Sequence, residues 1–579
     1  MKGLLAKRHT LRRHWREDPV AFVERTWRRR SSPVTERGLR ILDAGLGAVP
    51  SLTASSLAAL LIGDSDEIAF RLRSALARGP RGNRARSLAN IALAADFPQM
   101  AAVFASRMDD AEGMELTRAK LDFYNGHTTS AIDRLDPQSA RHSRLRDRYV
   151  AERDVFGQWT PSVSSVADYE PRPDVVLHLL TNSLPYTATG YTQRSHFLLR
   201  AQADEGWEVH AVTRLGYPES LGFAHSPKKQ RIDDVVYHRL LVKGGIPNLR
   251  DRLQQEAERM LELVLKVRPG VLHTTTHFVN GLVVRAVAEA VGIPWIYEVR
   301  GQLSDTWASK RGPEAASTER YERFNIRELE VMRDADLVLT LGTSMQQRIE
   351  AQGVPRDKIR LTPNAVGNAF LETPPSSRTV KPKLGLDPNK VLIGTVSSLV
   401  GYEGIDDLLT AFAILRDRRV DVELVVAGSG TAMQSLRVHA AELGLDPENI
   451  FVGRVPAAEA VNYHRALDVF VVPRKDFAVT RSVTPLKPVE AMASCRPVVA
   501  SDLPALREMV KDGATGICVT PEDPHALAAA IESLVDDSDL REKMGFAGRE
   551  LVLTTRTWKR NARLCLDAYA HLQLTREEI

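Results

Sequence analysis

The strongest constraint on the fold is an alternation of apolar runs and helical segments that begins at Asp174. Alternating strands and helices specify parallel sheets with helices on both faces. A Pro- and Ser-rich stretch at residues 373–382 interrupts the alternation, so two such sheets are expected. The predicted strands are residues 175–180, 208–213, 271–275, 295–299 and 337–341 in the first sheet and 391–396, 422–427, 450–452, 468–473 and 497–500 in the second. Helices are predicted between strands of the first sheet at residues 280–291 and 314–333. The predicted fold class is α/β, with two Rossmann-like domains.

The composition is that of an ordinary globular protein, with 43% hydrophobic residues in 579 positions. A formal net charge of +5 is too small to indicate nucleic-acid binding. Cys495, Cys518 and Cys565 lie far apart, which fits a reducing compartment without disulfides. No apolar run approaches the roughly 18 residues of a membrane-spanning helix, and the N-terminus lacks the apolar core of a signal peptide. The expected location is cytoplasmic, with a peripheral position at the inner membrane face as an alternative.

The N-terminal residues 1–50 are interpreted as a basic helical head. Residues 1–40 contain twelve Lys and Arg against four Asp and Glu, which gives a local charge of +8. Trp15, Phe22 and Trp27 are interleaved with the charges. Such a segment can lie on an anionic membrane surface, where each basic residue contributes about 1 kcal/mol. A basic helix packed on the next domain and an unattached arm are the alternatives.

Residues 51–157 are rich in Ala and Leu and predict a helical domain with an internal repeat. Three similar segments begin at Leu60, Leu93 and Phe123. The alanines at the same point of each segment are Ala69, Ala101 and Ala131. The pattern resembles degenerate tetratricopeptide repeats, which would offer a docking surface, whereas the alternative is a plain helical bundle. Residues 158–173, rich in Pro and Ser, predict a linker.

Two places in the first α/β domain lie at the carboxyl ends of predicted strands, where ligands of open α/β sheets bind. Gly190 precedes a helix predicted at residues 192–205, and a glycine there allows the backbone to approach an anion closely. Glu298 and Arg300 end another strand. Arg300 could hold a phosphate or a developing oxyanion, but it cannot act as a base near neutral pH. The alternative is a structural ion pair between these two side chains and the following helix.

In the second α/β domain, residues 481–502 predict a loop, a short helix and a strand in succession. The helix is expected to begin with Thr484 as its N-cap and to end near residue 494. Arg481 and Lys487 would then meet a diphosphate at the carboxyl edge of the sheet, and Glu490 would accept hydrogen bonds from ribose hydroxyls. The alternative is a solvated helix start with routine surface charges.

The segment KPVEAMASCRPVVASD resembles the donor-site segment of the GT-B glycosyltransferases called family 4. The segments IPWIYEVRGQLSDTW, MRDADLVLTLGTSM and GVPRDKIRLTPNAV resemble bacterial exopolysaccharide-type members of that family. The resemblance covers residues 174–575. It implies an acceptor domain at 174–372 and a donor domain at 373–556 that face a cleft. It also implies a C-terminal helix, 557–579, that crosses back to the first of them.

The sequence departs from the family pattern at several donor-site positions. Ser482 stands where the family has the first of two Glu residues, and Glu490 matches the second. Ser398 and Glu403 replace the Arg and Lys that pin the diphosphate in the family. Arg300 replaces a His that contacts the donor sugar. Two or more negative charges in a closed cleft need compensation, and Arg474, Arg481 and Lys487 are the nearby cations in the sequence.

The resemblance implies transfer of a sugar from a nucleotide-diphosphate sugar to a hydroxyl, with retention at the anomeric carbon and without a metal, in bacterial polysaccharide or glycoconjugate synthesis. The expected acceptor is a lipid-linked glycan, a polysaccharide or a protein. A GT-B scaffold without transfer activity, a repeat-based adaptor and a protein O-glycosyltransferase are alternatives. The expected catalytic residues are Arg300, Arg481 and Lys487. The expected donor-binding residues are Gly190, Ser398, Gly453, Arg454, Arg474, Ser482, Thr484 and Glu490.

No metal and no other cofactor is expected. The pairs Asp334/Asp336 and Asp64/Asp66 imitate the metal-binding DxD motif of other glycosyltransferases. The first leads directly into a predicted strand and the second lies in a repeat turn, so neither is in a suitable loop. His273 and His277, in the string HTTTH, are interpreted as loop histidines rather than zinc ligands.

Overall fold

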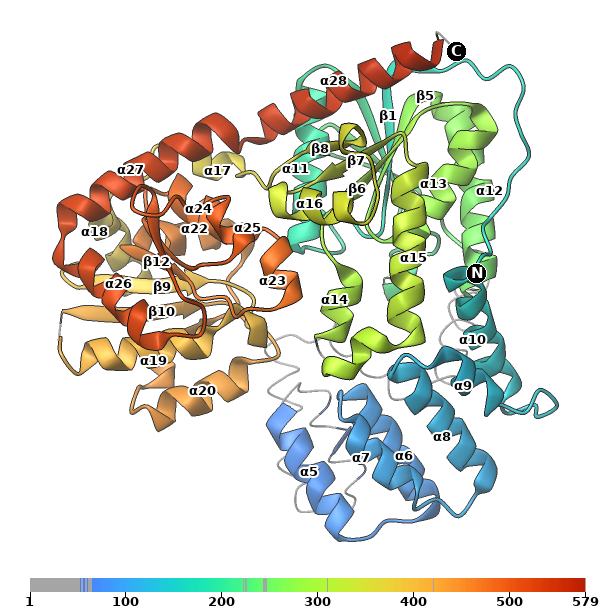
Figure 1. The fold of residues 1–579 in the computed structure, drawn as a ribbon, viewed down its shortest axis with the longest axis horizontal. Coiled ribbons are helices and arrows are strands. Elements are labelled where there is room, and N and C mark those ends of the chain that lie inside the picture. The colour runs from blue at the N-terminus through green and yellow to red at the C-terminus, as the bar shows by residue number, and fades with distance from the viewer. Residues whose placement is uncertain are drawn as a thin grey trace. The chain divides into compact units, whose positions relative to one another are not determined.

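A computed structural model describes residues 53, 56, 57, 60, 65–221, 223, 226–242, 247–309, 311–419 and 421–577 (Figure 1). The basic head predicted at residues 1–50 lies outside the described residues. Two sheets are present, an eight-stranded one in the order β3-β4-β2-β1-β5-β6-β7-β8 and a six-stranded one in the order β11-β10-β9-β12-β13-β14. The α/β class with two Rossmann-like domains and an all-α region before them is therefore confirmed.

By internal contacts the chain divides into two compact units. The first comprises residues 1–187, 209–295 and 303–335, and the second comprises residues 188–208, 296–302 and 336–579. This division does not follow the domain boundary at 372/373, which stays a prediction. The second unit contains the six-stranded sheet together with helix α11 (Gly190–Asp204) and the strands at one end of the larger sheet.

The N-terminal region of the first unit is all helical. Its helices are α5 (Ser65–Ala77), α6 (Gly82–Ala94), α7 (Pro98–Ala105), α8 (Ala111–Tyr124), α9 (Thr128–Asp133) and α10 (Ser143–Phe156). Tight turns join α6 to α7 and α8 to α9, and the predicted repeat alanines Ala69, Ala101 and Ala131 are all buried. Buried small residues let neighbouring helices pack closely. Kinship with tetratricopeptide repeats stays a prediction.

Aromatic and charged contacts attach α10 to the α/β part of the first unit. The ring of Phe156 lies edge-on to Phe278 and Phe324, with centroids 5.1 Å and 6.1 Å away. Arg320 of α15 (Glu319–Asp334) forms an ion pair with Glu152 and lies over the Phe156 ring. Aromatic packing of this kind adds stability beyond the area that it buries.

The strands of the larger sheet are β1 (Arg172–Leu180), β2 (Glu208–Thr213), β3 (Lys229–Ile232), β4 (Val235–Arg239), β5 (Pro269–Thr275), β6 (Trp295–Val299), β7 (Leu337–Thr340) and β8 (Ile359–Leu361). In this sheet the pairings β1–β5, β2–β4, β6–β7 and β7–β8 are parallel. Strand β3 pairs antiparallel with β4. The shorter helical elements around the sheet are η1 (Glu219–Leu221), α14 (Leu303–Ala308), η2 (Pro313–Ser317), α16 (Thr343–Ala351), η3 (Arg356–Lys358) and α17 (Asn368–Leu371).

The sequence prediction omitted several elements, among them the hairpin β3–β4, α12 (Leu249–Val267), β8 and, in the second sheet, β14 (Gly516–Val519). The burial of β3 alternates between half-buried and exposed residues, so it lacks the continuous apolar run of a central strand. The predicted helix at 314–333 is in fact η2 followed by α15. Its neighbour α13 (Phe278–Val291) begins just before the predicted start at 280. His273 is a buried residue of β5 rather than a loop histidine, and its ring lies 4.5 Å from that of His178.

All five strand pairings of the six-stranded sheet are parallel, and apolar clusters cover both faces. One cluster joins the sheet to α19, α20 and α26, and the other joins it to α22, α24 and α27. The strands are β9 (Val391–Val396), β10 (Val422–Ala427), β11 (Phe451–Gly453), β12 (Val469–Val472), β13 (Val498–Ser501) and β14 (Gly516–Val519). The helices are α18 (Ser377–Val380), η4 (Lys381–Leu384), η5 (Gly401–Glu403), α19 (Ile405–Arg416), α20 (Met433–Glu442), α21 (Pro447–Ile450), α22 (Ala457–Ala466), α23 (Ala478–Ser482), α24 (Lys487–Ala493), α25 (Pro504–Arg507) and α26 (Pro524–Asp536).

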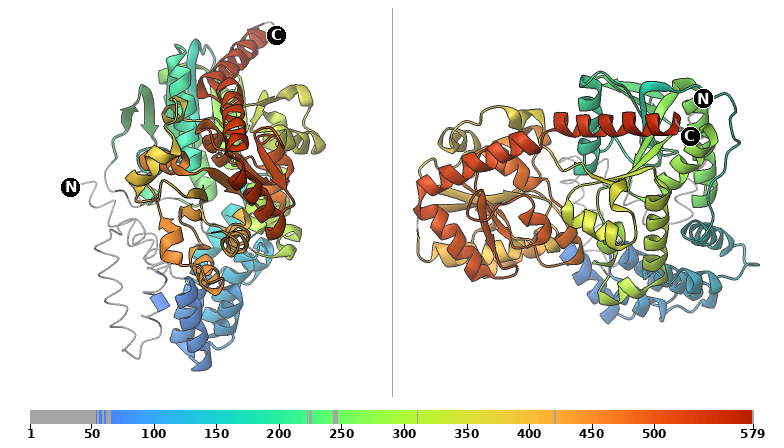
Figure 2. Two further views of the ribbon diagram at one scale, coloured as in Figure 1. Left: turned by 90° about the vertical axis from the view of Figure 1, so that its left-hand side faces the viewer. Right: turned by 45° about the horizontal axis from the view of Figure 1, so that its top comes forward.

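Two long helices end the described chain, α27 (Ser538–Thr555) and α28 (Trp558–Glu577), drawn in red in Figures 1 and 2. Helix α28 packs on α11 within the second unit. There, the buried Tyr569 hydroxyl accepts a hydrogen bond from Gln202 at 2.9 Å, and Arg563 pairs with Glu205 at 2.8 Å. Among the described residues, no helix has the length and apolarity needed to span a membrane.

Candidate functional site

The predicted donor segment forms two short helices instead of one. Helix α24 begins at Lys487, and α23 occupies residues that were predicted as loop. Thr484 is therefore not an N-cap, and this prediction was wrong. The signal that was missed is Pro488. In a helix capped by Thr484, Pro488 would be the fourth helical residue, whose N–H must donate to the Thr484 carbonyl, and proline has no N–H.

The loop between the two helices is held by Asn364. Its Nδ2 donates to the carbonyl of Thr484 at 2.8 Å, and both residues are buried. The Thr484 hydroxyl is also buried, and it has no hydrogen-bond partner within the described part of the chain. A buried hydroxyl without a partner is unusual and is consistent with a ligand position.

Lys487 is half-buried, and its ammonium donates to the hydroxyl of Ser397, at the end of β9, over 3.3 Å. No ion pair of Lys487 is found among the residues that the structure describes. Burial lowers the pKa of Lys487 below its ordinary value, and the negative charges of Glu403 and Glu490 oppose that shift. The alternative of a routine surface charge therefore does not describe Lys487.

Arg474 forms an ion pair with Glu403. Its Nη2 donates to Oε1 of Glu403 at 2.7 Å, its Nε donates to Oε2 at 3.1 Å, and its Nη1 donates to the carbonyl of Val483 at 3.0 Å. Burial alone would raise the pKa of Glu403, but attraction to Arg474 and the hydrogen bonds from it hold that pKa below the ordinary value. The acid at the family's Lys position thus neutralises a cation that was expected to face the diphosphate.

Arg481 lies in a different environment from Lys487. Its side chain is 60% exposed and forms an ion pair with Asp476. Ser482, at the place of the family's first Glu, is buried, and its hydroxyl donates to the carbonyl of Ala478 at 3.1 Å. The structure therefore does not bring Arg481 and Lys487 into one cluster, and the assignment of Arg481 to the diphosphate stays a prediction without support from its contacts.

The remaining residues predicted to bind the donor differ in how exposed they are. Glu490 is half-buried, and its Oε2 lies 3.4 Å from Nε2 of His464, a ring that is 1% exposed and stacks on Phe470. Ser398 and Arg454 are exposed. Gly453 ends β11 with a φ of +81°, a left-handed conformation that favours glycine. Their contacts with a donor stay predictions.

Arg300 lies at the end of β6 in a buried network. Its Nε donates to Oε2 of Glu298 at 2.8 Å, and its Nη1 donates to the hydroxyl of Ser195 at 2.6 Å. Arg194 of α11 donates to the other oxygen of Glu298 and to the carbonyl of Thr362. Two guanidinium groups thus share one carboxylate.

The network extends from Arg194 to the donor segment. Nη1 of Arg194 donates to Oδ1 of Asn364 at 3.2 Å, and Asn364 in turn holds the Thr484 loop. The sequence reading missed both of these residues. Helix α11 contains many other polar residues, so its sequence did not single out Arg194 as a buried charge that requires a partner.

Gly190 is the first residue of α11. Thr189 caps this helix in a capping box with Thr192, and Gly190 is exposed with open space where a side chain would begin. Tyr191 follows it, and its carbonyl accepts a hydrogen bond from Nη1 of Arg300 at 3.4 Å. The helix begins two residues earlier than predicted, so Gly190 belongs to its first turn.

Two family models match the two α/β halves of the chain. The model described as "Glycosyl transferase 4-like domain" matches residues 189–365, and "Glycosyl transferases group 1" matches residues 376–551. Together they span more than half of the chain, in the order of the two sheets. The chain is a GT-B glycosyltransferase. The predicted donor segment of the enzyme, α23–α24, lies inside the second match.

Curated relatives of this glycosyltransferase are themselves glycosyltransferases. It is 31% identical over 235 residues to the "GDP-mannose-dependent alpha-(1-6)-phosphatidylinositol monomannoside mannosyltransferase" of Mycolicibacterium smegmatis, a match that covers 40% of this chain and 61% of that relative's length. It is 27% identical over 384 residues to the "D-inositol 3-phosphate glycosyltransferase" of Paenarthrobacter aurescens, covering 64% of this chain and 90% of that one.

Solved structures show the same fold. Sucrose-phosphate synthase from Thermosynechococcus elongatus superposes with a TM-score of 0.57 at 21% identity, covering 69% of this chain and 99% of that chain. Anabaena Alr3699/HepE in complex with UDP and glucose superposes with a TM-score of 0.52 at 16% identity, covering 69% and 99%. The predicted GT-B fold is thereby confirmed.

Proposed function

We propose that this glycosyltransferase moves a sugar from a nucleotide-diphosphate sugar to a hydroxyl of its acceptor, with retention at the anomeric carbon and without a metal. The nucleotide-sugar part is supported by a relative that is named as GDP-mannose-dependent and by a structural neighbour that was solved with UDP and glucose. Retention and metal independence rest on the resemblance to family 4. The acceptor is proposed to be a lipid-linked glycan, a polysaccharide or a protein.

The observation that carries the proposal is the position of Lys487. Its ammonium is half-buried at the carboxyl edge of the six-stranded sheet and contacts the hydroxyl of Ser397. Arg474, by contrast, is neutralised by Glu403, and Arg481 is paired at the surface. In open α/β sheets, ligands bind beyond the carboxyl ends of the strands. Lys487 is therefore the cation of this segment that is best placed for a donor diphosphate.

The proposed chemistry needs a positive charge at that point. The bond between the anomeric carbon and the diphosphate oxygen breaks, and the electron pair stays on the leaving nucleoside diphosphate. The acceptor oxygen forms the new bond and loses its proton, which a phosphate oxygen of the leaving group or solvent takes up. A fixed cation beside the leaving oxygens stabilises the charge that grows there, which is electrostatic catalysis.

The test replaces Lys487 and compares it with a matched lysine. Lys487→Ala should slow transfer by about 10²- to 10³-fold, as the loss of other preorganised charges does. Lys475→Ala removes a nearby lysine that pairs with Asp406, and it should leave the transfer rate nearly unchanged. Equal rates in both variants would remove Lys487 from the site. Product NMR reports the anomeric configuration, and transfer in the presence of EDTA reports metal independence.

A second candidate function is a GT-B scaffold that binds a nucleotide or a partner without transfer. Ser482 in place of the family's acid and the neutral pair of Glu403 with Arg474 favour it, because both reduce the charge that family members place around the donor. Nucleotide binding without nucleotide release in the wild-type protein would support this candidate instead.

A further inference from the structure

Arg239, the last residue of β4, has a buried guanidinium that lacks a partner for most of its charge. The residue is 4% exposed. Its Nη2 donates to the carbonyl of Leu184 at 3.0 Å, whereas Nε and Nη1 are buried without a hydrogen-bond partner among the described residues. Burial lowers the pKa of Arg239 from its ordinary value. A buried cation without an acidic partner is costly and rare in proteins, so it points to an anion that is bound in use.

Aromatic rings surround this guanidinium. Its central carbon lies 5.3 Å from the ring of Tyr237, 5.6 Å from that of Tyr186 and 5.8 Å from that of Tyr217. Such rings attract a cation through their faces, but they leave its N–H donors unsatisfied. The cage therefore holds Arg239 in place and keeps two donors available.

Two of the three rings differ in how firmly they are held. The Tyr217 hydroxyl donates to the carbonyl of Ser183 at 2.6 Å and accepts from the Ser183 N–H at 3.1 Å, so that ring is fixed. Tyr186 is half-buried, and its ring packs against Phe223, a residue that is 36% exposed, with centroids 5.0 Å apart. Tyr186 and Phe223 are therefore more easily displaced from the Arg239 guanidinium than Tyr217 is. We call these two residues the aromatic cover.

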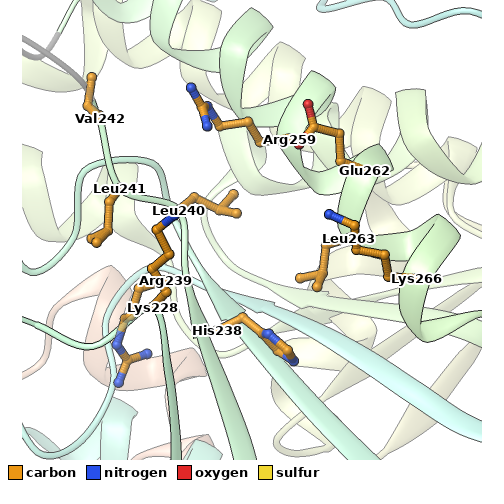
Figure 3. A pocket seen from close by; sticks show the side chains of 10 residues that line it. All are labelled: Lys228, His238, Arg239, Leu240, Leu241, Val242, Arg259, Glu262, Leu263 and Lys266. Carbon is orange, nitrogen blue, oxygen red and sulfur yellow. The ribbon is translucent and has the colours of Figure 1, made fainter.

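The cage lies at the end of the sheet where ligands of α/β folds bind. Arg239 ends β4, Leu184 and Tyr186 follow β1, and Tyr217 follows β2. The other side of β4 faces α12, where a hollow of about 270 Å³ is lined by His238, Leu240, residues of α12 and Arg239 itself. Figure 3 shows the Arg239 guanidinium directed away from α12. Arg239 therefore borders this hollow, but its guanidinium lies on the side of the aromatic rings.

We propose that Arg239 binds an oxyanion, a phosphate or carboxylate group carried by the acceptor, which enters when the aromatic cover moves aside. This inference rests on the proposed function, because it assigns a charge to the acceptor of that reaction. The acceptor would then be an anionic molecule with a free hydroxyl. The oxyanion accepts the two unsatisfied N–H groups and balances the buried charge.

The test titrates inorganic phosphate and, separately, acetate into the full chain by calorimetry. For at least one of the two anions, Arg239→Gln should weaken binding by tenfold or more. Arg231→Gln is the matched control, since Arg231 is 67% exposed on the neighbouring strand β3, and it should bind as the wild type does. Lys487→Ala removes the donor-side cation and should keep the Arg239-dependent binding. Equal affinities in Arg239→Gln and the wild type, or loss in Lys487→Ala alone, would overturn the proposal.

A second variant covers the case in which Arg239→Gln does not fold. Tyr186→Ala removes the aromatic cover and leaves the guanidinium in place, so it should strengthen binding of the same anion; unchanged or weaker binding would contradict the proposal. Because these titrations need no donor, they remain informative if no nucleotide sugar is turned over. Failure of the proposed function and failure of this inference can thus be told apart.

Discussion

Glu403 shows how one side chain can change the charge of a site. Its carboxylate is nearly buried and is bound by two nitrogens of Arg474, so the pair carries no net charge toward a ligand. Lys487, one loop away, contacts a serine hydroxyl instead. The positive charge that the donor segment can offer a ligand therefore depends on which of its cations is paired with an acid. Arg474 is paired with Glu403, whereas Lys487 has no acidic partner among the described residues.

Glu403→Gln should make unfolding less pH-dependent in acid. Attraction to Arg474 holds the pKa of Glu403 below its ordinary value of about 4.3. The pair therefore contributes its full stability above that value and loses it as the pH falls through the lower pKa of the folded state. The variant should be less stable at neutral pH by about 3 kcal/mol, because it leaves Arg474 buried and unpaired.

Chemical denaturation of both proteins from neutral pH down to pH 3 measures this difference. The difference in the free energy of unfolding between the wild type and Glu403→Gln should narrow as the pH falls. A gap that stays constant over this range would mean that Glu403 does not titrate below its ordinary pKa. Asp406→Asn is a suitable comparison, since that acid pairs with Lys475 at a more exposed position.

Glu490→Gln should weaken donor binding. If Glu490 accepts hydrogen bonds from ribose hydroxyls, the neutral amide forms a weaker bond to them, which costs about 1.5 to 3 kcal/mol. His464, whose Nε2 lies 3.4 Å from Glu490, holds the side chain from behind. Donor titration of the two proteins measures the loss. A structure with bound nucleotide in which Glu490 lies far from the ribose would end the assignment.

At the element scale, the loop of η5 is fixed against the end of β12. Gly404 adopts a φ of +69°, and a β-carbon there would lie 1.8 Å from the carbonyl oxygen of Pro473. This close approach places Glu403 beside Arg474. The ion pair between Glu403 and Arg474 therefore depends on Gly404, because a side chain at that position would overlap the backbone of Pro473.

Gly404→Ala should destabilise the protein by about 2 kcal/mol, because it adds backbone strain and an overlap with main-chain atoms that cannot move freely. Gly401→Ala is the matched control in the same loop, since open space surrounds that position. It should be neutral or slightly stabilising. Thermal unfolding compares the two variants, and equal melting temperatures would show that the loop yields without cost.

The sequence predicted the elements better than the contacts between them. Apolar runs such as residues 391–396 and 422–427 became strands with the predicted bounds, because a buried parallel strand needs a continuous apolar run. The hairpin β3–β4 was omitted because β3 lies at the edge of its sheet and lacks that run. The helix that contains Glu490 was predicted to begin too early, at Thr484. That start is incompatible with Pro488, which lacks the N–H that a helix beginning there would need.

The site was predicted in outline only. Lys487 could be singled out from its place in the motif, and its cation does lie at the sheet edge. Arg474 and Arg481 have the same charge in the sequence, but their partners Glu403 and Asp476 are decided by the fold. The cage of Arg239 combines aromatic residues from β4 and from the loops after β1 and β2. These residues lie far apart in the sequence, so no local sequence pattern predicts the cage.

At the scale of the whole molecule, the donor-site motifs and the basic head lie in different parts of the sequence. The motifs follow Asp174, and the local charge of +8 belongs to residues 1–40. The head lies outside the described residues, so its role rests on its sequence. We expect residues 1–165 to direct the enzyme to its acceptor rather than to take part in the chemistry.

Deleting residues 1–40 should lower binding to anionic liposomes and leave donor hydrolysis nearly intact. The attraction should weaken with added salt, because exposed charges are screened over about 8 Å at physiological ionic strength. Vesicle co-sedimentation at two salt concentrations measures it, with neutral vesicles as the control. Loss of donor hydrolysis in a shortened protein that is still folded would assign the head to the active site.

The purified protein is expected to turn over a nucleotide-sugar donor at the segment that contains Lys487. Incubation of the wild-type protein with a panel of nucleotide sugars, followed by detection of the released nucleoside diphosphate, measures this turnover. Release should occur from at least one donor, and it should be slowed by about 10²- to 10³-fold in Lys487→Ala and unchanged in Lys475→Ala. Binding of a nucleotide sugar without any release, in wild type and variants alike, would contradict this expectation.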